Sequence, residues 1–254
     1  MSYNKIVIFS GAGISAESGV STFRDSGGLW ENYKIEDVCE ISTWEANYNL
    51  VHEFYDQRRE ELGTVFPNLA HSMVSYWQKK YNKTAFVNNI TTNVDDLFER
   101  AGVVGTTHLH GYIPEVTCRI CGKTTNIGYN PVYSIDEHSG ELYLNNTLYA
   151  EHFSCTKKGQ NIFKPNVVFF GEMAPKYRVL NNTVQSCDDR TIVVIVGCSN
   201  QVVDFLRLVK DKKSKVFLID PNPKITYSFN DLFVVENKAT DGMLIVNDMI
   251  KDLI

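Results

Sequence analysis

The chain has 254 residues, 43% of them hydrophobic and 22% charged, with a net charge of -5 at pH 7. This size and composition are typical of a globular protein with one large domain and an inserted module, or with two small domains. The negative net charge argues against nucleic acid as the main partner. No apolar run approaches the roughly 20 residues that span a bilayer. We therefore expect no nucleic-acid or membrane partner and a cytoplasmic location.

Short apolar runs alternate with amphipathic stretches, and this pattern predicts a parallel sheet flanked by helices. Residues 34–82 and 113–164 break the pattern and are expected to be insertions that form a cleft with the sheet. Buried strands are expected at Lys5–Phe9, Ala85–Thr91, Asn166–Phe170, Thr191–Val196, Lys215–Asp220 and Leu232–Glu236. Helices are expected at Tyr48–Leu62, Asn68–Tyr81, Val94–Arg100, Gln201–Lys210 and Met243–Ile254.

A glycine-rich loop directly follows the first predicted strand. Its sequence from Gly11 to Ala16 matches G-x-G-x-x-G/A, in which the glycines let the backbone approach a pyrophosphate at a helix N-terminus. A plain turn between a strand and a helix explains the same residues. The acidic residue expected about twenty positions further on is ambiguous, because Glu36 and Asp37 close no obvious strand. An ordinary dehydrogenase is therefore not favoured.

Five sequence blocks occur in an order that is characteristic of one family. They are Gly11–Trp30, Thr91–Asp95, Leu109–Gly111, Val167–Glu172 and Gly197–Ser199. With these blocks the chain resembles the sirtuin (Sir2) family of NAD-dependent protein deacylases, and among them the desuccinylase-type members of bacteria and mitochondria. The resemblance spans nearly the whole chain.

The resemblance implies an α/β fold, with a Rossmann-type doubly wound parallel sheet and an inserted small domain. Residues 1–33, 83–112 and 165–254 would form the NAD-binding domain. The helical insertion 34–82 and the zinc-binding insertion 113–164 would together form the small domain. NAD and an acyl-lysine protein substrate, bound as an extended strand, would meet between the two domains. The products would be nicotinamide, free lysine and O-acyl-ADP-ribose.

The resemblance also implies roles for single residues. His110 corresponds to the family's general base, which takes a proton from a ribose hydroxyl, and Asn93 would assist catalysis. The substrate strand would add to the segment containing Val168, Phe170, Gly171 and Glu172 by main-chain pairing. Residues expected to bind the cofactor are Gly11, Ala12, Gly13, Phe23, Arg24, Thr92, Asn93, Asp95, Gly197, Ser199, Asp220 and Ala239.

Two positions depart from the family's pattern. Thr92 stands where the family usually has Gln, so a hydrogen bond to the ribose would be lost or bridged by water. Leu218 stands where an Asn is expected, which would weaken a contact with adenosine. Both changes would affect the affinity for NAD.

A second pattern indicates a metal site. Cys118 and Cys121 form a C-x-x-C pair, which in a reducing compartment is typical of metal-binding or redox sites. The family normally supplies a second pair, but here Cys155 is preceded three positions earlier by His152. Three cysteines and one histidine are a common structural zinc set. We predict a structural Zn²⁺ held by these four residues; a site completed by His138 and a site without metal are the alternatives.

A third pattern concerns the acyl group. Tyr55 and Arg58 are three positions apart on a predicted helix and therefore share one face. In the family, a Tyr-x-x-Arg at this place marks members that remove succinyl, malonyl or glutaryl groups. A guanidinium binds a carboxylate through two hydrogen bonds, and a phenol adds one more. A solvated helix face is the alternative. Cys39 falls where the family keeps a small residue beside this pocket.

The function that these patterns predict is NAD-dependent protein-lysine deacylation, with desuccinylase or demalonylase activity and deacetylase activity as well. A sirtuin-like NAD hydrolase, an ADP-ribosyltransferase and a non-catalytic NAD sensor are the alternatives. The zinc pattern, the segment Val167–Glu172 and the pair of Tyr55 and Arg58 argue against the hydrolase.

Overall fold

The computed structural model describes residues 2–20, 33–135, 138–199, 202–223, 225 and 227–254. Within this part of the chain, six parallel strands form one sheet in the order β11-β10-β9-β1-β2-β3. The strands are β1 (Lys5–Ser10), β2 (Phe86–Thr91), β3 (Thr107–His108), β9 (Thr191–Val196), β10 (Lys215–Ile219) and β11 (Leu232–Val235). The chain order reverses between β1 and β9, and in sheets of this kind ligands bind at the carboxyl ends of the strands beside that reversal.

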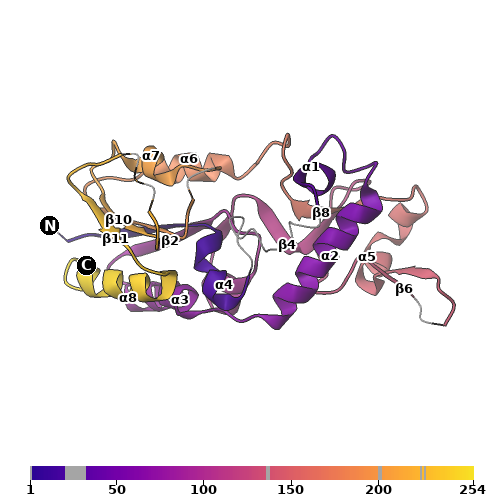
Figure 1. The fold of residues 1–254 in the computed structure, drawn as a ribbon, viewed down its shortest axis with the longest axis horizontal. Coiled ribbons are helices and arrows are strands. Elements are labelled where there is room, and N and C mark those ends of the chain that lie inside the picture. The colour runs from indigo at the N-terminus through magenta and orange to yellow at the C-terminus, as the bar shows by residue number, and fades with distance from the viewer. Residues whose placement is uncertain (1, 21–32, 136–137, 200–201, 224, 226) are drawn as a thin grey trace.

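Helices cover both faces of this sheet (Figure 1). On one face, α3 (Leu69–Lys80) and α8 (Ala239–Ile250) bury apolar side chains in a common core with the sheet. On the other face lie α6 (Tyr177–Gln185) and α7 (Phe205–Val209). These layers confirm the predicted doubly wound α/β fold. Because α3 packs with the sheet, we propose that the large domain resumes at this helix and not at residue 83.

The small domain combines α1 (Ile35–Val38) and α2 (Tyr48–Thr64) with the second insertion. In Figure 1 it lies at the end of the molecule opposite to both termini. The second insertion contains a three-stranded antiparallel sheet, a two-stranded hairpin and one helix. These elements are β4 (Gly111–Cys118), β5 (Thr124–Asn126), β6 (Tyr133–Ile135), β7 (Leu142–Leu144), α5 (Asn146–Thr156) and β8 (Phe163–Val167).

One predicted strand was wrong in position and in sheet. The run Asn166–Phe170 was expected as a buried strand of the parallel sheet, but β8 ends at Val167 and pairs antiparallel with β4. An apolar run shows that a strand is buried, but it does not show which sheet buries it. None of the helices in the described part of the chain is long and apolar enough to cross a membrane.

Helix boundaries differ from the predicted ones where side chains outside the helix bond to its first turn. The helix predicted from Met243 begins four residues earlier, at Ala239. Its first turn is capped by the side chain of Glu17, which accepts hydrogen bonds from the backbone N–H and the hydroxyl of Thr240. The helix predicted from Val94 is only α4 (Leu97–Arg100), because the Asp95 side chain accepts from the backbone N–H of Leu97. Such caps satisfy N–H groups that have no partner inside the helix.

Candidate active site

Three glycines join the carboxyl ends of β1 and β9 at the point where the strand order reverses. The backbone N–H of Gly13 donates to the carbonyl of Gly197 at 3.0 Å. A Cβ atom on Gly13 would lie 2.7 Å from the Cα of Gly197, and a Cβ atom on Gly11 would lie 2.8 Å from its carbonyl oxygen. Gly197 itself has φ of +61°. Gly11 and Gly13 therefore have no room for side chains, and Ala12 between them begins a short 3₁₀-helix.

A buried polar cluster lies beside this loop. The hydroxyl of Ser15 donates to Oδ2 of Asp95 at 2.9 Å and accepts from the amide of Asn93 at 3.0 Å. His71 approaches the same hydroxyl with Nε2 at 3.4 Å. Ser15 and His71 are fully buried, and the other two are at most 8% exposed. These contacts unite Asn93 and Asp95, both predicted site residues, with two residues that the sequence analysis did not single out.

Burial is the main influence on the charges of this cluster. It raises the pKa of Asp95, while the hydrogen bonds from Ser15 and Leu97 act in the opposite direction. Burial also lowers the pKa of His71 to about 4, so this imidazole is neutral at pH 7. A neutral imidazole and a carboxyl group that is already hydrogen-bonded therefore line this part of the site. Such groups suit an uncharged amide as a ligand better than an ion.

The two departures from the family's pattern have simple structural explanations. The backbone N–H and the hydroxyl of Thr92 both point to the carbonyl of Ser10, at 3.0 and 3.3 Å. Leu218 is 1% exposed and belongs to the core between the sheet and α6. The side chain of Leu218 therefore faces the interior, and its expected effect on the affinity for NAD stays a prediction.

The residues predicted on the adenosine side occupy the ends of the neighbouring strands. Gly197 and Ser199 follow β9, Asp220 follows β10 and Ala239 begins α8. Asp220 is 3% exposed and accepts a hydrogen bond from the backbone N–H of Asn222. The predicted contacts of Phe23 and Arg24 lie outside the described residues.

His110 lies where the large sheet meets the small domain, two residues after the end of β3 and directly before β4. Its carbonyl accepts a hydrogen bond from the backbone N–H of Val168 at 2.8 Å, and its Nε2 lies 2.9 Å from the hydroxyl of Tyr177. Burial lowers the pKa of the imidazole, and a hydrogen bond to the backbone of Thr92 partly offsets that effect. Gly111, which follows, has φ of +97°, and a Cβ there would lie 2.1 Å from the carbonyl oxygen of Asn166.

The neighbouring histidine, His108, is engaged elsewhere. Its Nδ1 lies 2.8 Å from the carbonyl of Asn93, and its Nε2 lies 3.1 Å from the carboxylate of Glu99. The residue is 4% exposed. Both nitrogens therefore have protein partners, and the contacts favour a structural role for His108.

The predicted substrate segment is partly engaged with its own surroundings. The backbone N–H of Phe170 donates to Cys39 at 2.7 Å, and its carbonyl accepts from Ile41 at 3.0 Å. The side chain of Glu172 folds back to accept from the backbone N–H of Phe169 and from Lys164. We therefore propose that a substrate strand pairs with Gly171 or with the carbonyl of Val168, whose N–H is bonded to His110, and that Phe170 and Glu172 hold the segment in place.

Tyr55 and Arg58 lie on α2 beside this segment. The hydroxyl of Tyr55 is 3.5 Å from the sulfur of Cys39, and its ring stacks on Phe169 at 5.8 Å between centroids. The guanidinium of Arg58 lies over the ring of Phe54, and one of its nitrogens donates to the carbonyl of that residue at 2.7 Å. Burial lowers the pKa of Arg58 to about 10, so it stays positively charged at pH 7.

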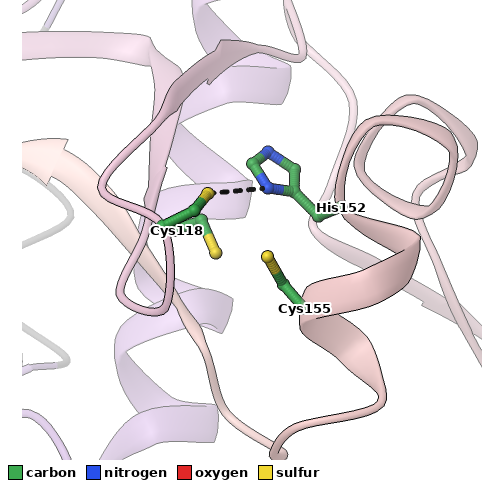
Figure 2. Close-up of side chains that lie close together, drawn as sticks. Cys118, His152 and Cys155 are labelled. Atoms are coloured by element: carbon green, nitrogen blue, oxygen red, sulfur yellow. Dashed lines mark hydrogen bonds between the residues drawn. The ribbon is translucent and has the colours of Figure 1, made fainter.

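The structure brings Cys118, Cys121, His152 and Cys155 together. One possible ligand atom from each lies within 4.8 Å of all the others. Figure 2 shows Cys118, His152 and Cys155 pointing toward a common point. Cys118 is the last residue of β4, Cys121 lies in the turn that follows it, and α5 carries the other two. The donor set fits Zn²⁺, and four protein ligands would leave no open position for catalysis.

The contacts of His152 indicate which of its nitrogens would bind the metal. The hydroxyl of Thr125 donates to the carboxylate of Glu151 at 2.7 Å, so it can only accept from Nε2 of His152, 2.9 Å away. Nε2 then carries the proton, and Nδ1, which lies 3.5 Å from the sulfur of Cys121, has the lone pair. The backbone at His152 is non-helical within α5 (φ -123°, ψ 21°), which aims the imidazole at the cysteines.

Comparisons with known proteins agree with this geometry. The model of the Sir2 family matches residues 11–204. The chain belongs to the Sir2 family. It is 37% identical over 224 residues to an NAD-dependent protein deacylase of Helicobacter hepaticus, covering 83% of this chain and 81% of the relative. It is 34% identical over 250 residues to an NAD-dependent protein deacylase of Campylobacter jejuni, covering 97% of each.

Solved Sir2 structures are also similar to this sirtuin. The structure of a Sir2 homologue in complex with NAD superposes with a TM-score of 0.74 at 26% identity, covering 98% of this chain and 90% of that one. A Sir2 homologue variant in complex with ADP-ribose gives a TM-score of 0.77 at 25% identity, covering 98% and 93%.

Some polar residues at the site of this sirtuin are not marked as site residues by any motif in the sequence. Ser15 lies inside the glycine-rich block but was interpreted as part of the loop alone. His71 and Tyr177 lie outside the five blocks and reach the site only through the packing of α3 and α6. A buried histidine in an amphipathic helix is a weak signal, because most such residues are structural.

Proposed function

We propose that this protein is an NAD-dependent protein-lysine deacylase that prefers acyl groups ending in a carboxylate. The observation that carries the proposal is the place of His110. It lies at the same edge of the large sheet as the buried cluster of Asn93 and Asp95. Its carbonyl accepts a hydrogen bond from Val168 in the predicted substrate segment. A base at this place reaches both a dinucleotide on the sheet and a lysine side chain that enters beside the segment.

The residues present fit NAD. The loop from Gly11 to Gly13 has close-packed backbone and no side chain that would exclude a pyrophosphate. The carboxyl group of Asp95, with Asn93 and Ser15 beside it, would accept a hydrogen bond from the nicotinamide amide. When bound, NAD would supply the ADP-ribosyl group that accepts the acyl group, with nicotinamide as the leaving group.

His110 would act as the general base. A neutral imidazole accepts a proton, and the lowered pKa of His110 keeps it neutral at pH 7. The hydrogen bond between its carbonyl and Val168 positions it relative to the acyl-lysine. Transfer of the acyl group to the ribose of ADP-ribose would then release free lysine.

Arg58 and Tyr55 support the preference for acidic acyl groups. A half-buried guanidinium that stays charged attracts a carboxylate strongly, because little water screens it. Burial raises the pKa of Tyr55 well above its ordinary value, so its phenol stays protonated and can donate a hydrogen bond. A neutral acetyl group would make neither contact, and its removal is expected to be slower.

The test is mass spectrometry of products from matched succinyl-lysine and acetyl-lysine peptides, with a control that contains NAD alone. We expect succinyl removal ahead of acetyl removal, with O-succinyl-ADP-ribose as a product. His110→Ala is expected to lower the rate by at least about 100-fold, as loss of a general base does. NAD consumption without peptide turnover would favour an NAD hydrolase, and ADP-ribose attached to protein would favour an ADP-ribosyltransferase.

The acyl preference has a separate test. Arg58→Met keeps a flexible unbranched stem and removes the charged guanidinium. We expect kcat/KM for succinyl-lysine to fall about 100-fold, since hydrogen bonds to charged groups contribute about 1.5–3 kcal/mol each, while deacetylation changes little. Arg190→Met, at an exposed arginine before β9, is the control and should affect neither activity. An equal loss of both activities in Arg58→Met would contradict the assigned pocket.

A further inference from the structure

A tyrosine lies directly against the side chain of His110. The hydroxyl of Tyr177 is 2.9 Å from Nε2, and the two ring centroids are 6.0 Å apart at an interplanar angle of 41°. Tyr177 is the first residue of α6 and lies outside the five sequence blocks. The contact therefore comes from the tertiary structure and has no counterpart in the sequence analysis.

The direction of this hydrogen bond follows from the second partner of the imidazole. His110 also bonds the backbone of Thr92 through a contact that raises its pKa, as donation to a carbonyl does. A carbonyl can only accept, so the ring nitrogen that faces Thr92 carries the proton and the other nitrogen has the lone pair. Burial raises the pKa of Tyr177 and keeps its phenol protonated. We therefore assign the O–H of Tyr177 as the donor and Nε2 of His110 as the acceptor.

We propose that Tyr177 is a positioning residue of the reaction, which holds His110 with Nε2 unprotonated and caps that nitrogen until a ribose hydroxyl takes its place. The inference rests on the proposed function, in which His110 is the general base. A ribose hydroxyl that gives its proton to His110 must occupy the hydrogen-bonding position that Tyr177 fills in this structure. The two hydroxyls therefore compete for one lone pair.

The substrate segment and the cap belong to one stretch of chain. The backbone N–H of Val168 holds the carbonyl of His110 at 2.8 Å, and Tyr177, nine residues later, holds the side chain. Between them, Glu172 binds the backbone N–H of Phe169, and the N–H of Tyr177 donates to Ala174 at 3.2 Å. A peptide that adds a strand beside Gly171 would thus act on the short segment that ends at Tyr177. Substrate binding and release of the cap are expected to be coupled.

The cap has a measurable electrostatic consequence. A hydroxyl that donates to Nε2 stabilises the neutral imidazole and lowers its affinity for a proton. Among the residues that the structure describes, the polar groups at this ring are the Tyr177 hydroxyl from α6 and the Thr92 backbone from the loop after β2. The backbone of Thr92 has no group that gains or loses a proton in this pH range. Removal of the hydroxyl is therefore expected to shift the titration of His110 upward.

The experiment compares Tyr177→Phe with Tyr112→Phe in the full chain. Tyr112 is a matched control, because its ring lies 5.0 Å from the other histidine, His108. NMR titration without NAD should show a higher pKa for His110 in Tyr177→Phe and no change in the control. The acid limb of the pH profile of kcat/KM should move to higher pH by the same amount. Above that limb, kcat/KM should rise about fivefold, the effect of one neutral hydrogen bond.

Two results would overturn the proposal. The first is an unchanged titration of His110 in Tyr177→Phe. The second is a loss of kcat at every pH with an unmoved acid limb, as a purely structural role predicts. Failure of the proposed function has a different signature: His110→Ala would retain deacylation, whereas the NMR titration of Tyr177→Phe does not depend on turnover.

Discussion

The cofactor side of the large sheet and the small domain build their parts of the site in opposite ways. On the sheet, Gly11, Gly13 and Gly197 meet backbone to backbone at neighbouring strand ends. In the small domain the contacts are between side chains, as between Cys121 and His152. A backbone contact has no room for an added atom, whereas a side-chain contact accepts another group of similar chemistry. This difference explains why the glycine block keeps the family's pattern while a histidine stands in place of a zinc-binding cysteine.

The largest effect is expected from an alanine at Gly197. Its Cβ would lie 2.3 Å from the backbone nitrogen of Ile14, in addition to the strain of a φ of +61°. Gly140→Ala is the matched control from the small domain, because Gly140 has φ of +71° but no atom within 4 Å of the added Cβ. We expect Gly197→Ala to lower the free energy of unfolding by at least about 4 kcal/mol, and Gly140→Ala by about 1–2 kcal/mol.

Urea unfolding of both variants measures this difference. Equal losses would mean that the left-handed conformation, and not the close backbone contact, determines the need for glycine on the sheet.

A change of pH is expected to have an intermediate effect on the free energy of unfolding. It tests both the small domain and the large sheet. His52 on α2 and His71 on α3 are 3% and 0% exposed, and burial lowers the pKa of each to about 4. The unfolded chain, with pKa near 6.5, binds more protons than the folded one between pH 6.5 and 4, so stability falls as the pH falls through this window. Each histidine is expected to contribute on the order of 3 kcal/mol to that loss.

Unfolding at pH 7 and pH 5 with His52→Gln and His71→Gln separates the two contributions. Each substitution should make the stability less dependent on pH. A pH dependence that persists in both variants would assign the loss to other groups.

The smallest effect is expected at the zinc site. Thr125→Val removes the hydroxyl that fixes the orientation and tautomer of His152. Loss of such a contact typically lowers the affinity for the metal about 10-fold to 100-fold. Competition with a chelator measures the affinity, and Thr117→Val is the control, because this threonine lies on the same small sheet but bonds Thr124 and Asn166. Equal affinities in the two variants would show that Nδ1 ligation does not depend on Thr125.

Much of the site could be predicted from the sequence because its motifs are local. The spacing of Cys118, Cys121, His152 and Cys155, together with the zinc pattern that the family resemblance implies, predicted a cluster that the structure brings together. The phosphate loop was recognisable because a strand, two glycines and a helix start follow one another within a few residues. Tyr55 and Arg58 could be placed on one helix for the same reason, but the acyl group they bind stays a prediction.

The fold class, the family and the glycine loop could be predicted from the sequence, because each depends on residues that are close in the chain or on the order of blocks along it. The three-dimensional packing was needed to show which sheet contains β8, that α3 packs with the large sheet, and that Tyr177 lies against His110. These contacts join segments that are far apart in sequence. Their geometry depends on how whole elements pack, and no local pattern of residues encodes that.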